Sequence, residues 1–338
     1  MRKLVWSGAA LVAMLSLVAC GPASSPTPST SSAAPTTTSA PSESASPTPS
    51  PTDTEPVYAF NGDCTNAFSN IELATAFDHA MTDLGVNWSV GQEEALGGVK
   101  CTWWADDMYL GAVVVLTALP VVAAPDSVVD AAQCVENNCE ATMLTSQGWY
   151  SMVTFGSLTS DDPAIIQGLL TQAAERGDAL PQPVVPQATA STWARPPIAC
   201  ADLAELLVPP DGSPITLVVE DTADSSLLAP LYATLGNFCT FSMPSSDPES
   251  LGVELMFSVT VVPGGAVAFD DGVIRGKGVP VQIANGEAAE VVMPFVAEGN
   301  MGIFATDGTN TVAVAAPHEL APTEFTWVAE QLIDALAP

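Results

Sequence analysis

The sequence predicts an α+β protein in which two related domains follow a long polar segment. Three observations favour this arrangement: two cysteines recur at similar spacing in each half, each half ends in an amphipathic helix pattern, and strand patterns lie between them. Each domain is expected to be an antiparallel sheet packed by an N-terminal and a C-terminal helix. The 282 residues from Val57 onward are enough for two cores.

The first residues have the pattern of an export signal. Arg2 and Lys3 precede an apolar run of 15 residues, 4–18, which is shorter than the roughly 20 residues that a membrane-spanning helix needs. The run ends in Leu17-Val18-Ala19-Cys20, which resembles the lipobox of bacterial lipoproteins. The resemblance implies that residues 1–19 are a signal peptide and that Cys20 carries acyl chains such as palmitate. The alternatives are an ordinary signal peptide with an incidental cysteine, and an uncleaved anchor.

The segment after Cys20 is expected to be a tether. Of the 36 residues in 21–56, 27 are Ser, Thr or Pro and none is aromatic, so the stretch cannot bury a core. Residues 20–56 would therefore hold the domains away from the extracytoplasmic face of the cell membrane.

Six further cysteines form a repeat. Cys64 and Cys101 are 37 residues apart and Cys200 and Cys239 are 39 apart, and Gly98-Val99-Lys100-Cys101-Thr102-Trp103 matches Gly236-Asn237-Phe238-Cys239-Thr240-Phe241 at glycine, cysteine, threonine and an aromatic position. An even number of cysteines in an exported chain favours disulfides, for which fifteen connectivities exist. The repeat predicts Cys64 with Cys101, Cys200 with Cys239, and Cys134 with Cys139 in a local loop. We expect structural rather than redox or zinc-binding roles, because Cys-x-x-Cys and histidine partners are missing.

Local patterns place the elements of the first copy. Ser69 and Glu72 form a capping box, and a helix is expected from there to Gly85. Strands are expected over 98–104, 109–119 and 149–155, and a closing helix begins at Pro163. The apolar stripes of the two helices are Leu73, Phe77, Ala80, Met81 and Leu84, and Ile165, Ile166, Leu169, Leu170 and Ala173.

The second copy follows the same order. A helix over 200–207 is expected to stop before Pro209 and Pro210, and residues 253–261 alternate in the manner of a strand with one buried face. Shorter strands are predicted over 281–283, 290–294, 302–306 and 311–315. The stripe of the last helix consists of Phe325, Val328, Ala329, Leu332, Ile333 and Leu336. The predicted boundaries are 57–178 for the first domain, 179–197 for a Pro-rich linker and 198–338 for the second domain.

At these residues the chain resembles a group of actinobacterial lipoprotein domains of unknown function. In that group a cysteine before the first helix is matched by a later Cys-Thr-Trp on a strand, here Cys64 and Cys101-Thr102-Trp103. The second copy departs from the pattern, with Phe241 in place of tryptophan. The resemblance implies an α+β sandwich similar to the PsbP-like fold, and it supplies no reaction to carry over.

The net charge of the chain limits the classes of partner that it can bind. The net charge is −31, and would be −33 without Arg2 and Lys3, so the surface repels nucleic acid and anionic lipid. The acidic clusters are interpreted as turns or helix caps rather than metal ligands, since none matches an EF-hand. These clusters are Asp106-Asp107, Asp161-Asp162, Asp221 with Asp224, and Asp270-Asp271. We expect no metal and no cofactor.

Catalytic motifs are missing from the sequence, which favours a protein that is not an enzyme. The two histidines are His79, expected on a helix one turn from Asp83, and His318, expected near the start of the last helix. There is no Gly-x-Ser-x-Gly, His-Glu-x-x-His or phosphate-binding glycine loop. A hydrolase that uses a carboxylate pair remains an alternative.

Tryptophans offer a candidate contact surface. The repeat matches Trp103 to Phe241 and Trp104 to Ser242, so Trp103 is the expected core residue and Trp104 points to the other face. Trp104 would then join Trp88 or Tyr109 in contacting an envelope protein, a lipid or a glycan, unless a helix covers it. The sequence thus predicts a membrane-anchored binding or surface-interaction module. The alternative is a protein that captures a solute, lipid or cation for a transporter.

Overall fold

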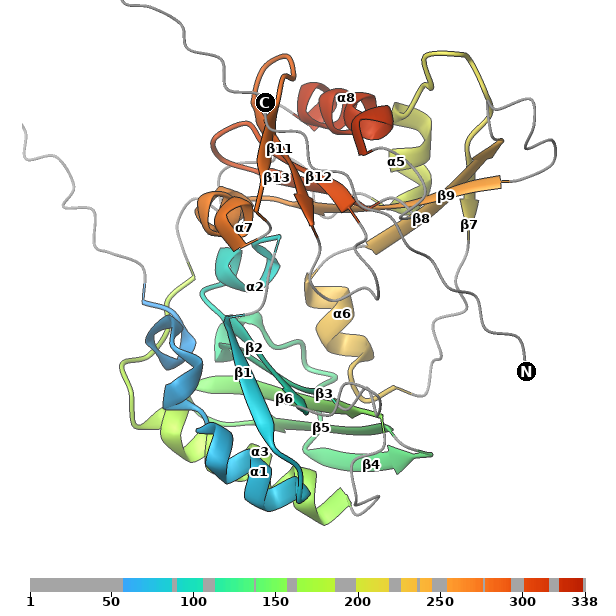
Figure 1. Ribbon diagram of the computed structural model, residues 1–338. Helices are drawn as coiled ribbons and strands as arrows, with labels where there is room; N and C mark the ends of the chain where they lie inside the picture. The colour runs from blue at the N-terminus through green and yellow to red at the C-terminus, as the bar shows by residue number, and fades with distance from the viewer. Residues whose placement is uncertain are drawn as a thin grey trace, which may run out of the picture. The chain divides into compact units, whose positions relative to one another are not determined.

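The computed structural model of the chain contains two antiparallel sheets with helices packed on them (Figure 1). Backbone contacts divide the chain between Asp53 and Thr54, so both sheets belong to one compact unit. Within the described ranges, no helix is both long and apolar enough to cross a membrane. The structure describes residues 57–86, 90–105, 113–136, 138–156, 163–185, 199–218, 226–235, 238–244, 254–275, 277–292, 301–315 and 322–336.

The first sheet has six strands in the order β1-β2-β3-β6-β5-β4. The helices in this half of the chain are α1 (Asn70–Phe77), α2 (Gln92–Ala95) and α3 (Pro163–Asp178), and α1 and α3 pack on the same face of the first sheet. The strands are β1 (Met81–Val86), β2 (Val99–Ala105), β3 (Val113–Pro120), β4 (Ala131–Val135), β5 (Asn138–Leu144) and β6 (Gly148–Phe155).

The second sheet has seven strands in the order β7-β8-β9-β13-β12-β11-β10. The helices in this half of the chain are α5 (Cys200–Leu206), α6 (Ala229–Leu235), α7 (Phe269–Arg275) and α8 (Thr326–Leu336), and α5 and α8 share one core on the second sheet. The strands are β7 (Thr216–Val218), β8 (Phe238–Pro244), β9 (Glu254–Val262), β10 (Val279–Val281), β11 (Glu287–Val292), β12 (Met301–Thr306) and β13 (Thr311–Ala315).

The two sheets share both strand order and register. Six strands of each run in the same order, and the second sheet adds β10 at its edge. Cys101 lies opposite Leu116, which lies opposite Met152, and in the second sheet Cys239 lies opposite Val259, which lies opposite Val314. When Cys101 is aligned with Cys239, the residues that lie opposite them on the next two strands are therefore aligned as well.

The three predicted disulfides are confirmed. Cys64 is bonded to Cys101 and Cys200 to Cys239, each with a Cα–Cα distance of 5.5 Å. In the first half the bond joins the short 3-10 segment Cys64–Asn66, which precedes α1, to β2, and in the second half it joins the start of α5 to β8. The third bond, between Cys134 and Cys139, closes the hairpin of β4 and β5.

The core residues of the helices are largely those predicted from periodicity. In α3, Ile166, Leu169, Leu170 and Ala173 are buried, whereas Ile165 is only partly covered. Of the six residues predicted in the stripe of the last helix, five are buried in one core, namely Phe325, Val328, Ala329, Leu332 and Ile333. The side chain of Leu336 lies outside the described part of the structure. Trp103 and Phe241 are fully buried at equivalent positions of β2 and β8, as predicted.

The first predicted helix is too long. The capping box is present, because the Ser69 hydroxyl accepts from the Glu72 N–H while the Glu72 carboxylate accepts from the Ser69 N–H. The helix ends at Phe77, because Asp78 takes a left-handed conformation with φ of 54°, which Asp tolerates better than most residues. The chain then turns into β1, so Met81 belongs to a strand. His79 and Asp83 are therefore not a helical pair.

Other boundaries also differ from the sequence prediction. The strand expected over 281–283 is β10, which ends at Val281, and Asp270 and Asp271 begin α7 rather than forming a turn. Strands β1, β4, β5 and β7 and helices α2, α6 and α7 were not predicted. The clusters Asp106-Asp107, Asp161-Asp162 and Asp221 with Asp224 lie outside the described residues.

Helices α2 and α6 occupy the same place in the order of elements, immediately before β2 and before β8. Each packs on the sheet of the other half. Val90 and Ala95, at α2, join Phe269 and Phe304 in a cluster on the second sheet. Leu228, Leu231 and Leu235, at α6, pack with residues of the first sheet, Leu119, Trp149 and Val153.

Two hydrogen bonds mark this exchange. The Thr311 hydroxyl of β13 donates to the Val90 carbonyl at 2.6 Å, and the Gln92 side chain of α2 donates to the Leu235 carbonyl of α6 at 3.1 Å. Gly91 lies so close to the backbone of Gly265 that a Cβ would stand 2.5 Å from its carbonyl oxygen. A glycine is needed at this approach.

Candidate functional site

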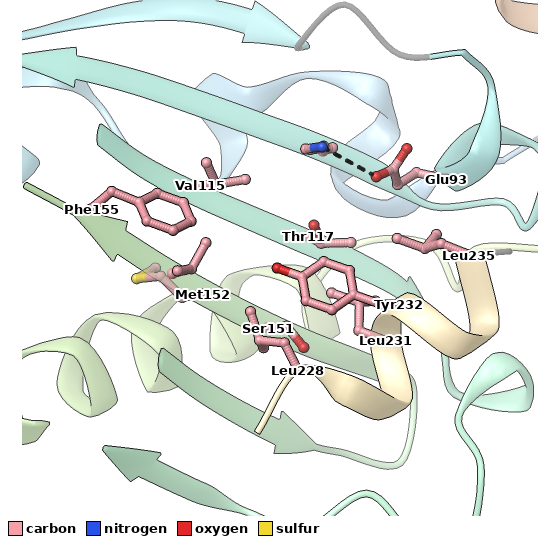
Figure 2. Close-up of a pocket in the computed structure, with 12 residues that line it drawn as sticks. Glu93, Val115, Thr117, Ser151, Met152, Phe155, Leu228, Leu231, Tyr232 and Leu235 are labelled. Atoms are coloured by element: carbon pink, nitrogen blue, oxygen red, sulfur yellow. Dashed lines mark ion pairs between the residues drawn. The ribbon is translucent and has the colours of Figure 1, made fainter. Parts of the chain in front are cut away.

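A cavity of about 160 Å³ lies between α6 and the face of the first sheet opposite α1 and α3 (Figure 2). Strands β2, β3 and β6 supply its floor and α6 supplies one wall. Apolar side chains dominate the lining, with polar groups at a few positions. The lining residues are Glu93, Lys100, Val115, Thr117, Ser151, Met152, Val153, Phe155, Leu228, Leu231, Tyr232 and Leu235.

A polar row crosses the floor of the cavity. Lys100 of β2 lies opposite Thr117 of β3, Thr117 lies opposite Ser151 of β6, and Ser151 lies opposite Thr142 of β5. Directly opposed residues on antiparallel strands have their Cβ atoms about 5 Å apart. One ammonium group and three hydroxyl groups therefore follow one another across four strands. We call these four residues the polar row.

The Thr142 end of the polar row is closed by hydrogen bonds. The Thr142 hydroxyl accepts from the Trp149 indole N–H at 3.0 Å and from the Ser151 hydroxyl at 3.4 Å. Over the part of the chain that the structure describes, the side chains of Lys100 and Thr117 make no hydrogen bond. The open end of the row is thus the end inside the cavity.

Glu93 and Lys100 form an ion pair beside the floor. Lys100 Nζ lies 3.9 Å from Glu93 Oε1, which is within ion-pair range but too long for a hydrogen bond. Glu93 is only 2% exposed, whereas about a third of the Lys100 side chain reaches solvent. The Glu93 carbonyl accepts from the N–H of Leu96 and of Gly98, and this turn carries the chain from α2 into β2.

Gly98 is required for that turn. A Cβ on Gly98 would lie 2.3 Å from the Leu119 side chain and 2.6 Å from the Ala118 carbonyl oxygen. The close approach keeps α2 against β2 and β3, and so holds Glu93 beside Lys100.

Local sequence explains why α6 forms and which side it buries. Pro230 lies in the first turn, where a helix needs no backbone donor. The Leu228 N–H donates to the Ser226 hydroxyl at 3.1 Å, which supports the start of the helix. Leu228, Leu231 and Leu235 recur at helical spacing, so they face the sheet together.

Glu140 of β5 fixes the beginning of α6. Its carboxylate accepts from the Ser226 hydroxyl at 3.0 Å and from the Leu227 N–H at 2.9 Å. Hydrogen bonds to an ionised acceptor are stronger than those between neutral groups. The first sheet therefore supplies the anchor for a helix of the second half.

Tyr232 brings a phenol to the cavity. Its ring lies over the strands that carry Thr117 and Ser151 (Figure 2). Burial raises the pKa of Tyr232, and the nearby Glu140 charge raises it further. The hydroxyl is therefore protonated at neutral pH and able to donate a hydrogen bond, and it makes none to another residue in the described ranges.

Only some of the site residues predicted from sequence lie in the part of the chain that the structure describes. Cys20, Trp88, Tyr109 and His318 lie outside the described residues. Trp104 is half-buried at the end of β2, on the same face as Lys100 but outside the cavity lining. Trp104, the one predicted contact residue that the structure describes, does not line the cavity.

His79 lies in the turn between α1 and β1. Its Nε2 is buried without a hydrogen-bond partner in the described part of the chain. Its predicted partner Asp83 lies in β1, opposite Trp103.

A second hollow, of about 530 Å³, lies near α7 and is lined by Asp270, Glu287 and Asp307 among others. The Asp307 carboxylate accepts from the N–H groups of Thr309 and Asn310 and from the Asn310 side chain, so it stabilises its own turn. Among the residues that the structure describes, no group of three or more His, Cys, Asp or Glu could hold a metal ion. This hollow is therefore a weaker candidate than the cavity at α6.

No protein-family profile matches the chain, and no curated protein is significantly similar to it in sequence. Among solved structures it is similar to the crystal structure of the di-domain ARO/CYC StfQ from the steffimycin biosynthetic pathway. The identity is 11%, the match covers 83% of this chain and 96% of that chain, and the TM-score is 0.19. A likeness at this score carries no argument about fold or activity.

Proposed function

We propose that this protein is an exported lipoprotein, anchored through acylated Cys20, whose folded part binds a small, largely apolar molecule without converting it. The cavity between α6 and the first sheet is the observation that carries the proposal. An engineered apolar cavity of similar size is known to take up benzene. The proposed ligand is therefore small, since drug-sized ligands need roughly 300 Å³ or more.

The composition of the lining supports binding rather than turnover. Among the described residues that line the cavity, Glu93 is the single carboxylate, and its position beside Lys100 gives it a partner. A carboxylate pair facing across the cavity, which a glycosidase-like hydrolase would need, is not found among those lining residues.

The folded part, we infer, arose by duplication of one α+β domain. The shared strand order, the shared register around Cys101 and Cys239, and the equivalent disulfides support this inference. The buried pair Trp103 and Phe241 occupies matching positions. The duplication then includes α2 and α6, which cover each other's sheets.

The anchoring part of the proposal is tested by fractionation. Replacing Cys20 with Ser should move the protein from the membrane fraction to the soluble extracytoplasmic fraction. Ser25→Ala, in the tether, is the control and should stay in the membrane. Retention of the Cys20→Ser chain in the membrane would contradict lipid anchoring.

The binding part is tested with an apolar probe that matches the cavity in size. Ligand-detected NMR should show that α-methylstyrene binds the purified chain. Leu231→Phe, which adds a ring to the cavity wall, should weaken this binding at least about tenfold, because the cavity then has no room. Leu144→Phe, on β5 outside the cavity, is the control. Equal binding by all three chains would place the probe elsewhere and reject the cavity.

A further inference from the structure

The polar row belongs to the first sheet alone. In the second sheet the positions equivalent to Lys100, Thr117, Ser151 and Thr142 are Phe238, Thr260, Ala313 and Phe304, which lie opposite one another in the same order. An ammonium and two of the three hydroxyl groups are thus replaced by apolar side chains. Because the second sheet forms without the polar row, the fold does not require it.

Three hydrogen-bond donors of the cavity are open. The Lys100 ammonium, the Thr117 hydroxyl and the Tyr232 hydroxyl line it, and none makes a hydrogen bond within the described ranges. Thr117 is only 5% exposed, so its hydroxyl has little access to bulk water. Tyr232 is 54% exposed and about a third of the Lys100 side chain reaches solvent, so water can reach these two donors. A molecule that displaces this water from the cavity must offer an acceptor in its place.

The charges around the row disfavour an anion. Glu93 is buried beside Lys100 and already balances the ammonium charge. The chain as a whole has a net charge of −31, which repels anionic ligands. The open donors therefore suit a neutral oxygen better than a carboxylate.

We propose that the ligand is a neutral molecule whose apolar body packs against α6 and Val153, and whose carbonyl or similar oxygen accepts hydrogen bonds from Lys100, Thr117 and Tyr232. This inference rests on the proposed function. Thr117 lies directly between Lys100 and Ser151 across the sheet, so the oxygen sits over β2 and β3. Leu228 and Leu231 stand on the α6 side of the same cavity (Figure 2). Glu93 acts through Lys100 and is a positioning residue.

Three probes of nearly the same shape separate the contribution of a neutral oxygen to binding from those of the apolar body and of a negative charge. Acetophenone carries the carbonyl, α-methylstyrene replaces its oxygen by a methylene group, and benzoate is the anion. Ligand-detected NMR titration of the purified chain should give acetophenone an affinity about 3- to 10-fold higher than that of α-methylstyrene, as expected for one or two hydrogen bonds. Benzoate should bind more weakly than acetophenone.

Substitutions in the polar row test whether its side chains cause the difference in affinity between acetophenone and α-methylstyrene. Thr117→Val and Lys100→Met should each lower the affinity for acetophenone toward that for α-methylstyrene. Thr260→Val, the same change at the equivalent position of the second sheet, is the matched control and should leave the ratio of affinities as in the wild type. Retained binding of α-methylstyrene shows that each variant is folded.

The outcomes distinguish this inference from the proposed function. If acetophenone and α-methylstyrene bind equally, or if their ratio survives both variants, the polar row does not recognise the ligand, although the cavity still binds. If benzoate binds most tightly, the ligand is an anion and the neutral assignment is wrong. If none of the three probes binds, the proposed function fails and this inference fails with it.

Discussion

Arg176 is the residue that ties the closing helix of the first domain to the opening one. Its guanidinium donates to both oxygens of Glu72 and to the Ala67 carbonyl, and it lies 5.5 Å from the centre of the Phe68 ring. These hydrogen bonds, together with those from Ser69, hold the pKa of Glu72 down to about 2. A single ion pair thus links α1 and α3 over the core.

The lowered pKa gives a pH-dependent contribution to stability. Folding lowers the pKa of Glu72 from its ordinary value of 4.5 to about 2. The contribution of the ionised carboxylate to the free energy of unfolding is therefore complete above about pH 4.5 and is lost as pH falls toward 2. We expect Glu72→Gln to lower the free energy of unfolding at pH 7 by less than about 1 kcal/mol, since the pair is partly exposed.

Denaturant unfolding at a series of pH values measures this effect. The gap between wild type and Glu72→Gln should close between about pH 4.5 and pH 2. Arg176→Met should remove the same interaction, so adding it to Glu72→Gln should cost less than the sum of the two single changes. A gap that stays constant with pH would show that the ion pair is not its source.

Some single residues were predictable from sequence and others were not. The cysteine pairing and the burial of Trp103 follow from the repeat, because position along the chain was enough to match Cys101 with Cys239. The polar row was not predicted. Lys100, Thr117 and Ser151 are far apart in sequence and become neighbours only through strand register, which the hydrophobic pattern of β3 and β6 does not specify.

At the scale of elements, α6 is held at both ends by the first half of the chain. Glu140 binds the residues that precede the helix, and Gln92 binds the carbonyl of its last residue. The helix itself is only seven residues long, so its stability comes from this docking and from the contacts of its leucines.

Removing the Glu140 carboxylate should loosen α6. We expect Glu140→Ala to raise hydrogen exchange over residues 226–235 and to lower the free energy of unfolding by about 1 kcal/mol, because two partly buried donors lose their charged acceptor. Hydrogen exchange measured by mass spectrometry reports the first change, and denaturant unfolding reports the second. Glu287→Ala, exposed on β11, is the control.

One outcome of the Glu140→Ala experiment would contradict the anchoring role of this carboxylate. If exchange over 226–235 does not change, α6 is held by its leucines alone and Glu140 is not its anchor.

The elements that periodicity missed share a physical reason. Helices α2 and α6 have four and seven residues, too few for a helical repeat to stand out. The opposite error occurred after Phe77, where Met81 and Leu84 continue the helical spacing although Asp78 turns the chain into β1. Longer elements such as α3 and β6, with 16 and eight residues, were predicted closely because their patterns extend over several turns or strand residues.

For the molecule as a whole, the exchange of α2 and α6 makes the two halves depend on each other. The α6 leucines complete a cluster on the first sheet, and Val90 and Ala95 complete one on the second. Two domains joined only by a linker would have no such shared clusters.

Cleavage of the folded chain between its two halves tests whether the halves depend on each other. With a protease site inserted at residue 190, the two fragments should remain together on size-exclusion chromatography after cleavage, because the shared clusters stay buried. Adding Leu231→Asp should weaken the association, since a charge would then enter the cluster on the first sheet. Separation of the wild-type fragments would show that the halves are independent domains.

The central claim is that an anchored chain holds a small molecule under α6. Native mass spectrometry of the protein purified from its own membrane tests it most directly. We expect a non-covalent mass that is present in the wild type, absent in Leu231→Phe and retained in Leu144→Phe, on top of a covalent acyl mass at Cys20 that all three carry. Spectra in which the wild type and Leu231→Phe carry the same bound species, or neither carries one, would contradict it.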